Sequence, residues 1–148
     1  MWSPHVTVAC IVERDGRFLM VEELVNGQLV LNQPAGHLDP GESLVEAAAR
    51  ETLEETAWTV RPDAVVNCCF LQAPEERVSY FRVCFAATPL EHDSVRELDK
   101  EIVRAVWLSE AELTAAHDRH RSPSVAQCLS DYLGGRRYPL SFLQQFSI

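Results

Sequence analysis

The sequence predicts an α/β fold in which helices cover a mixed β-sheet. Five or six segments rich in β-branched and aromatic residues alternate with two or three segments of helical pattern. The hydrophobic fraction of 47% and the charged fraction of 24% are typical of a globular chain, which excludes a collagen, a coiled coil or a disordered tail. A chain of 148 residues can bury a core of its own, and we expect a single domain over residues 1–148.

Strands are predicted where short apolar runs lie between turn signals. Residues 5–13 are apolar on both faces, which predicts a central strand. Asp15-Gly16 and Asn26-Gly27 are hairpin signals, each followed by another apolar run. The expected strands are residues 5–13, 18–22, 29–31, 65–71, 78–87 and 102–107.

Helices are predicted from their capping residues. Ser43 and Glu46 have the spacing of a capping box, so a helix should begin there and run to about Thr56. A short helix is expected at 110–116. Ser122 and Pro123 predict the start of a last helix, which Gly134-Gly135 should end. Two loops are expected, over residues 32–41, which contain two prolines and two glycines, and over the polar residues 89–100.

Charge and cysteine content limit the function classes. The net charge of −9 argues against a broad basic surface for a nucleic-acid polymer. No apolar run is long enough for a transmembrane helix, and no signal peptide is visible. The five cysteines, an odd number within apolar segments, suit reduced thiols in a cytoplasmic protein. A phosphorylated substrate would need a bound cation to invert the local field.

The helix expected from Ser43 carries three glutamates on one face. Glu51, Glu54 and Glu55 fall within an arc of roughly 100°. Glu51 and Glu55 are like charges at i,i+4 near the helix C-terminus, where the macrodipole opposes them. A divalent cation would remove this conflict, and carboxylate ligands favour Mg²⁺ or Mn²⁺. The alternative is a solvated acidic face on a surface helix. Glu46 and Arg50 should point elsewhere, in the favourable i,i+4 order for a solvated pair.

The loop before this helix completes a longer pattern. Backbone groups between Pro34 and Gly41 could meet a metal ion or a phosphate. The fixed spacing comprises Gly36, Glu42, Arg50-Glu51 and Glu54-Glu55.

The spacing from Gly36 to Trp58 resembles the box of Nudix hydrolases. All of the family's glycine and charged positions up to Glu55 match. Thr52 stands where the family usually has an aliphatic residue. Ala57 stands where it has glycine, which places the helix end in question more than the acidic positions.

The resemblance implies a fold, a cofactor and a set of ligands. The fold would be an α/β/α sandwich with a mixed β-sheet. Glu51, Glu54 and Glu55, with the carbonyl of Ala35, map onto ligands of Mg²⁺, with Mn²⁺ as an alternative. Such a cation would neutralise pyrophosphate charge and lower the pKa of a water molecule. Glu42 and Arg50 map onto groups that orient the loop and the catalytic acids.

Other roles in catalysis remain open among several residues. The general base is expected to be Glu54 or, second, Glu101, with Glu97 and Asp99 as weaker loop candidates. Gln33, His37 and Tyr80 are the candidates for substrate contacts. The alternative for Gln33 and His37 is a turn-forming role, and for Tyr80 a core position. Trp2 could line a pocket or simply pack. Arg77 and Arg82 could meet phosphate, although an arginine on a strand is usually just exposed.

Further segments resemble a bacterial phosphatase branch of the family. They are residues 4–10, 32–38, 44–51, 121–123 and 137–140. This likeness implies release of phosphate from nucleoside tri- and diphosphates, thiamine pyrophosphate and hydroxymethylpyrimidine pyrophosphate. The expected partners are small phosphorylated substrates, with no nucleic-acid polymer and no membrane, and the chain is expected to be a monomer or homodimer.

Two other functions stay open at this point. Pro74, sixteen residues after Trp58, weakly resembles a marker of ADP-ribose pyrophosphatases, so an ADP-ribose or other dinucleotide pyrophosphatase is one alternative. The other is a non-catalytic Nudix-like module that binds a nucleotide without cleaving it. The complete set of box acids argues against such a module.

Overall fold

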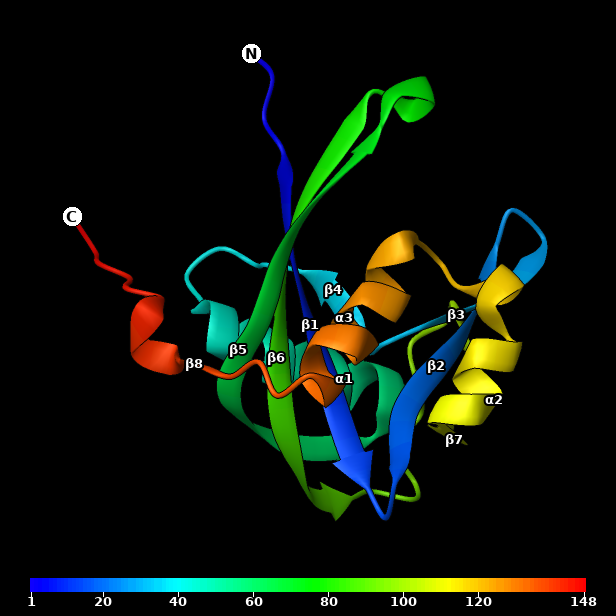
Figure 1. Cartoon of the computed structure of the whole chain (residues 1–148). Helices are drawn as coiled ribbons and strands as arrows, with labels where there is room; N and C mark the ends of the chain where they lie inside the picture. Colours follow the sequence, from blue (N-terminus) through cyan, green and yellow to red (C-terminus); the bar gives the residue numbers. More distant parts are fainter.

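One mixed sheet of eight strands organises the structure, a computed structural model that describes all residues 1–148 (Figure 1). The strands are β1 (His5–Arg14), β2 (Arg17–Val25), β3 (Gln28–Asn32), β4 (Ala35–His37), β5 (Trp58–Ala73), β6 (Val78–His92), β7 (Ile102–Ser109) and β8 (Tyr138–Pro139). The α-helices are α1 (Leu44–Thr56), α2 (Glu110–Ala115) and α3 (Pro123–Leu133). Short 3₁₀ turns lie at Pro74–Glu76, His117–Arg119 and Leu140–Phe142.

Strand β1 is central, as its two apolar faces predicted. The strand order is β3-β2-β1-β6-β5-β8, with β4 also paired to β1 and β7 to β2. The β1–β6 pair is parallel and the other pairs are antiparallel, so the sheet is mixed. The prediction of an α/β fold with a mixed sheet is confirmed.

Helices α1 and α3 cover opposite faces of β1 and its neighbours (Figure 1). Val8 and Cys10 of β1 pack with Ala47 of α1, whereas Ala9 and Ile11 pack on the side of α3. This alternation follows from the two-residue period of a strand. We call these two sides the α1 face and the α3 face. Alternate residues of β1 and β6 therefore point to the α1 face and to the α3 face.

Strands β5 and β6 are longer than predicted, and the polar loop is correspondingly shorter. We expected a loop from residue 89, but β6 continues to His92 and pairs with the start of β5. Pairing with β5 outweighs the polar composition there, and the ring centroids of Trp58 and His92 lie 5.0 Å apart. Pro89 lies opposite Val60, and the pairing register shifts between Thr59 and Val60. This irregularity accommodates a proline, which cannot donate a hydrogen bond within the sheet. Similarly, the expected loop 32–41 contains the short strand β4.

The predicted ends of α1 are confirmed. Ser43 and Glu46 form the reciprocal hydrogen bonds of a capping box. At the other end Ala57 adopts the left-handed conformation, with φ 63° and ψ 14°, and donates its N–H to the carbonyl of Leu53. A left-handed alanine costs roughly 1–2 kcal/mol relative to a right-handed one. The helix therefore ends where the family has glycine, at an energetic cost, and the glutamates stay in place.

None of the helices has the length and apolar character that a membrane crossing requires.

Candidate active site

Three carboxylates meet beside the C-terminal half of α1. Ligand oxygens of Glu51, Glu55 and Asp99 all lie within 4.8 Å of one another. Asp99 is held there by its own backbone, whose N–H donates to the carbonyl of Glu54 at 3.1 Å. We considered Asp99 only as a weaker candidate for the base, and the structure places it among the acids of the metal prediction. Glu54 lies outside this group of three.

The three acids keep their protons to a higher pH than usual because they are withdrawn from water. Burial is the main cause that raises the pKa of Glu55 to about 9 and that of Glu51 to about 7. The N–H of Ala35, which donates to Glu55 Oε1 at 2.9 Å, opposes the shift at Glu55, and the nearby Glu23 and Glu51 add to it. Burial also raises the pKa of Asp99, with Glu54 as the next cause. The site thus concentrates carboxyl oxygens whose ionisation is opposed by burial and by the neighbouring acids.

Gly36 allows the loop of β4 to approach Glu51. A Cβ built at Gly36 would lie 2.0 Å from Cδ of Glu51 and 2.3 Å from both of its carboxylate oxygens. A glycine is therefore required by close approach here, not by an unusual backbone angle. The loop and the helix are in contact at the point where Glu51 and Glu55 point away from α1.

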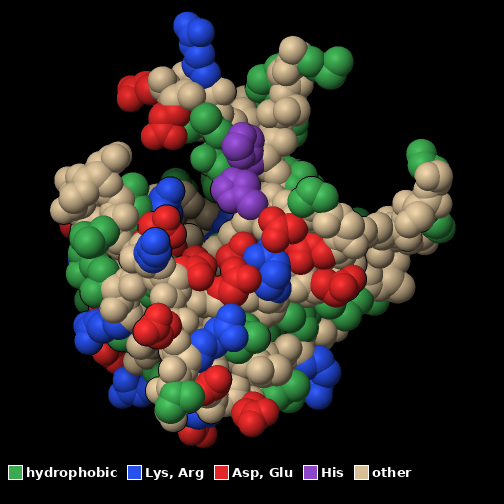
Figure 2. All heavy atoms as spheres, turned by 180° about the vertical axis from the view of Figure 1, so that it is seen from behind, with side chains coloured by type: hydrophobic (Ala, Val, Ile, Leu, Met, Phe, Trp, Pro, Cys, Tyr) green, Lys and Arg blue, Asp and Glu red, His purple; other side chains and the backbone are tan.

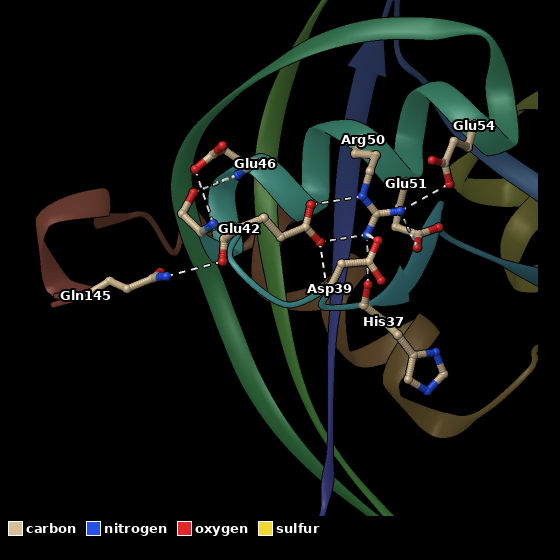
Figure 3. A network of polar contacts seen from close by, with 9 residues as sticks. His37, Asp39, Glu42, Glu46, Arg50, Glu51, Glu54 and Gln145 are labelled. Atoms are coloured by element: carbon tan, nitrogen blue, oxygen red, sulfur yellow. Dashed lines mark hydrogen bonds and ion pairs between the residues drawn. The ribbon is translucent and has the colours of Figure 1, made fainter. Parts of the chain in front are cut away.

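Arg50 binds several of the surrounding acids (Figure 3). Its Nε and Nη2 donate to the two oxygens of Glu42 at 2.9 and 2.7 Å, which is a bidentate pair. Its other acceptors are Glu51 at 3.0 Å, Glu54 at 3.1 Å and the carbonyl of His37 at 2.9 Å, with Asp39 at 3.3 Å. The bond from Arg50 is the main cause that lowers the pKa of Glu42. Arg50 therefore ties the loop before α1 to the acidic face of the helix.

The predicted pair of Glu46 with Arg50 is wrong. Glu46 accepts from the backbone N–H of Ser43 at 3.2 Å, and Figure 3 shows it on the capping turn, away from Arg50. The capping requirement at the N-terminus of α1 explains this, because the amide of Ser43 has no partner within the helix. On the same turn, Gln145 from the C-terminal segment donates to the carbonyl of Glu42 at 3.2 Å.

Three aromatic side chains form a cluster on the same face as the acids. His37 and Tyr80, both candidates for substrate contacts, have ring centroids 6.3 Å apart. His5, which we did not single out, joins them: its Nδ1 is 3.1 Å from Nε2 of His37, and its ring is 5.5 Å from Tyr80. Figure 2 shows histidine side chains directly beside the acidic side chains on this face. His5 is exposed on β1 and lies opposite Tyr80 in the β1–β6 pair. The sequence alone did not indicate which residue of β6 would lie opposite His5.

Gln33 and Arg82 are buried rather than open to a substrate. Gln33 is 2% exposed, with Nε2 donating to the carbonyl of Val125 at 2.9 Å and Oε1 accepting from Arg82 at 2.9 Å. Arg82 is 4% exposed, so the expectation of an exposed arginine is wrong. It lies on the α3 face, where Cys84 two residues along the strand is in the core. Apolar residues on both faces of β6 were the signal that this arginine would be covered.

The remaining predicted residues lie around or away from this site. Glu101 is exposed, but its charge raises the pKa of both Asp99 and Glu23, which places it near the acids. Glu97 is exposed and makes no side-chain hydrogen bond. Trp2 and Arg77 line a separate hollow of about 280 Å³ at the β5–β6 hairpin. The carbonyl of Ala35 stays a prediction.

The residues present fit a hard divalent cation. The donor set consists of carboxylate oxygens, without a cysteine or histidine among them, which is the set that Mg²⁺ and Mn²⁺ prefer. All three carboxyls have raised pKa values, so binding a cation would offset a cost that the fold carries.

Comparisons with known proteins agree with this geometry. The family model of the NUDIX domain matches residues 3–128. The phosphatase NudJ of Escherichia coli strain K12 is 41% identical over 147 residues, which cover 99% of this chain and 95% of that protein, and the phosphatase NudJ of Shigella flexneri matches equally.

Solved structures show the same fold. A NUDIX hydrolase from Nitrosomonas europaea is 43% identical with a TM-score of 0.94, covering 97% of this chain and 98% of its own. An ADP-ribose pyrophosphatase from Streptococcus suis, 17% identical with a TM-score of 0.68 over 92% of this chain and 96% of its own, shares the fold alone. The chain therefore belongs to the Nudix hydrolases, enzymes that hydrolyse phosphoric anhydride bonds.

Proposed function

We propose that this chain is a magnesium-dependent phosphatase that acts on small diphosphates and triphosphates. The substrates we propose are nucleoside tri- and diphosphates, thiamine pyrophosphate and hydroxymethylpyrimidine pyrophosphate. The observation that carries the proposal is the meeting of Glu51, Glu55 and Asp99 beside α1. The identity to proteins named phosphatase NudJ supports phosphate release over other Nudix reactions.

Glu51, Glu55 and Asp99 would hold the cation, with Glu54 and the carbonyl of Ala35 as further proposed ligands. Bound Mg²⁺ supplies charge neutralisation for the substrate's phosphate oxygens and acidifies a water molecule. The protein's part is to keep the ligand oxygens together against their mutual repulsion. It does so through the Ala35 N–H on Glu55 and the Arg50 guanidinium on Glu51.

Glu54 is the proposed general base. Its Oε2 accepts from Arg50 at 3.1 Å, which orients the carboxylate and leaves Oε1 without a hydrogen bond from the protein. Oε1 can therefore accept the proton of an attacking water. Glu101, exposed near Asp99, is the second candidate for this role. Arg50 is proposed to orient the acids through these hydrogen bonds and not to donate a proton, because a guanidinium stays protonated in proteins.

His37 and Tyr80 are proposed to contact the organic part of the substrate. The carbonyl of His37 accepts from Arg50, which also binds the acids, and the ring of Tyr80 lies 6.3 Å from that of His37. Gln33, although a candidate from the sequence, has both ends of its amide bound within the protein. We therefore do not include it among the substrate contacts.

The test is a product assay by ³¹P NMR with Mg²⁺ on the proposed substrates and on ADP-ribose. We expect free phosphate from the first group, abolished by EDTA and by Glu54→Gln. Glu46→Gln is the matched control, since it changes a glutamate of the same helix that serves the cap, and it should retain turnover.

Other products would overturn the proposal. AMP from ADP-ribose as the dominant product would make the chain a dinucleotide pyrophosphatase. Binding of a nucleotide without turnover would make it a binding module.

The cytoplasm is the proposed location. Its support is the set of five free cysteines, three of them buried, which suits a reducing compartment.

A further inference from the structure

Arg82 is a buried cation without an anionic partner. Its side chain on β6 is 4% exposed, and its hydrogen bonds go to neutral groups only. Burying a charge is costly unless bonds compensate, and a carboxylate would be the usual compensation. We therefore expect the guanidinium of Arg82 to hold the residues that it binds in a particular position.

The bonds of Arg82 hold the segment that connects β3 with β4. Its Nη2 donates to Oδ1 of Asn32 at 3.1 Å and to Oε1 of Gln33 at 2.9 Å. Its Nη1 donates to Sγ of Cys128 on α3 at 3.0 Å. Gln33 then reaches α3 itself, through Nε2 and the carbonyl of Val125 at 2.9 Å. The connector is thus fastened to β6 and to α3 by side chains.

The connector leads directly into β4, whose first two residues touch the acidic cluster. The carbonyl of Pro34 accepts from the N–H of Cys10 at 3.0 Å. The N–H of Ala35 donates to Glu55 at 2.9 Å, and Gly36 lies against the carboxylate of Glu51. Three residues at most separate these contacts from the bonds of Arg82.

We propose that Arg82 is a positioning residue for the cation site. By fixing Asn32 and Gln33, it sets where Ala35 and Gly36 stand against Glu55 and Glu51, and so sets the affinity of the site for a divalent cation. This inference rests on the proposed function for the presence of the cation. Lysine cannot replace Arg82, because one ammonium group lacks the planar fork that reaches Asn32, Gln33 and Cys128 together.

The test is equilibrium binding of Mn²⁺ to the purified protein, measured by the EPR signal of the free ion. Removing an outer partner of a metal site typically costs 10–100-fold in affinity, so Arg82→Lys should weaken Mn²⁺ binding at least about tenfold. Gln33→Met, which keeps the side-chain volume but breaks both bonds, should weaken it similarly. The double variant should be no weaker than the poorer single variant, because both act through one path.

A matched control separates positioning from general damage. Arg104→Lys also shortens an arginine fork, which binds Glu22 at 2.9 and 3.1 Å, but it lies off the connector. It should leave Mn²⁺ affinity unchanged. If Arg82→Lys fails to fold, Gln33→Met carries the test alone.

Two further readouts would not follow from a loss of stability. Hydrogen exchange should quicken at the Ala35 amide in folded Arg82→Lys protein while the core amides of β1 keep their wild-type rates, since a general loss of stability would quicken both. In turnover, excess Mn²⁺ should restore kcat towards the wild-type value, with the KM for the diphosphate unchanged.

The outcomes distinguish this inference from the proposed function. If Glu51→Gln weakens Mn²⁺ binding and the folded Arg82 and Gln33 variants do not, the positioning role is wrong and the cation site stands. If the wild-type protein binds no Mn²⁺, or Glu51→Gln has no effect, the cation site itself is wrong and the inference falls with it.

Discussion

Arg50 and Arg82 each join segments that are distant in the sequence, but they do so in opposite environments. Arg50 lies at the surface of the site and binds the carboxylates of Glu42, Glu51 and Glu54. Arg82 lies in the core of the α3 face and binds two amides and a thiol. Both reach the loop between β3 and α1, Arg50 through His37 and Arg82 through Gln33.

The two arginines differ in whether their hydrogen-bond acceptors are charged. The acids around Arg50 carry charges that a substrate and a cation can use, and their protonation changes with pH. The acceptors around Arg82 are neutral at any pH in the ordinary range, so its contacts are constant. In the roles proposed above, Arg50 orients the reacting groups, while Arg82 fixes the backbone segment against which they are placed.

Glu54→Gln should give the largest effect on the Arg50 side. Loss of a general base typically costs 10²–10⁴-fold, and we expect kcat to fall by about that factor. The free energy of unfolding should change by less than about 1 kcal/mol, because Arg50 keeps its pair with Glu42. Steady-state phosphate release and urea unfolding check both numbers. Turnover within tenfold of wild type would show that the base lies elsewhere, with Glu101 as the next residue to change.

Gly36→Ala tests the loop that both arginines hold. The added methyl would occupy the place of the Glu51 carboxylate, which is the flexible end of a side chain and can swing away. We expect kcat/KM to fall about 100-fold from the misplacement, with little change in melting temperature. Gly16→Ala is the control, for which we expect a loss of stability without a loss of activity. Gly16 has φ +75° and open space, so alanine there should cost about 1–2 kcal/mol of stability and leave turnover intact. Equal losses of activity in the two variants would refute the close-approach argument.

Arg50→Met and Arg82→Met should differ in how their cost depends on pH. Arg50 holds the pKa of Glu42 below its usual value of 4.5. A depressed carboxyl pKa contributes stability above the unfolded value, and that stability is lost as the pH falls through the folded value. Arg50→Met should therefore cost about 1–3 kcal/mol at pH 7 and clearly less near pH 3.

Arg82→Met has no carboxylate partner to protonate, so its cost should be similar at both pH values. Urea unfolding of the two variants and wild type provides the comparison. An equal pH dependence for both variants would contradict the distinction between the two arginines.

Glu55→Gln should give the smallest effect, on the apoprotein. The pKa of Glu55 is raised to about 9, so between about pH 4.5 and 9 the folded state retains a proton that the unfolded state releases, and stability falls as the pH rises. Glutamine removes this cost. In EDTA the variant should melt clearly above wild type at pH 8 and together with it at pH 4, since each kcal/mol shifts Tm by roughly 2–4 °C at this size. Calorimetry checks this. Added Mg²⁺ should reverse the order at pH 8, because only the wild-type site binds it well.

Local patterns were sufficient to predict the elements around Arg50, although not its partners, since the expected pair with Glu46 is wrong. The capping box, the spacing from Gly36 to Glu55 and the hairpin dipeptides act over a few residues, and the structure has them as expected. Even the alanine at position 57 did not move the end of the helix, because the fold tolerates its left-handed backbone.

The Arg82 side depends on contacts that no local pattern contains. The same holds for Asp99 on the acidic side, which reaches Glu51 and Glu55 only because the loop between β6 and β7 runs past the end of α1, and its backbone bond to Glu54 spans 45 residues. Arg82 meets Gln33 across 49 residues. Likewise, β6 extends to His92 because β5 is there to pair with it, against the polar composition of residues 89–92.

The most direct test of the central claim is the stoichiometry and affinity of Mn²⁺ binding by the wild-type protein and its Glu51→Gln and Glu55→Gln variants, without substrate. We predict saturable binding by wild type that weakens at least about tenfold in each variant, with Glu46→Gln unchanged. Equal binding by all four proteins would contradict the claim that the carboxylates of α1 hold the cation.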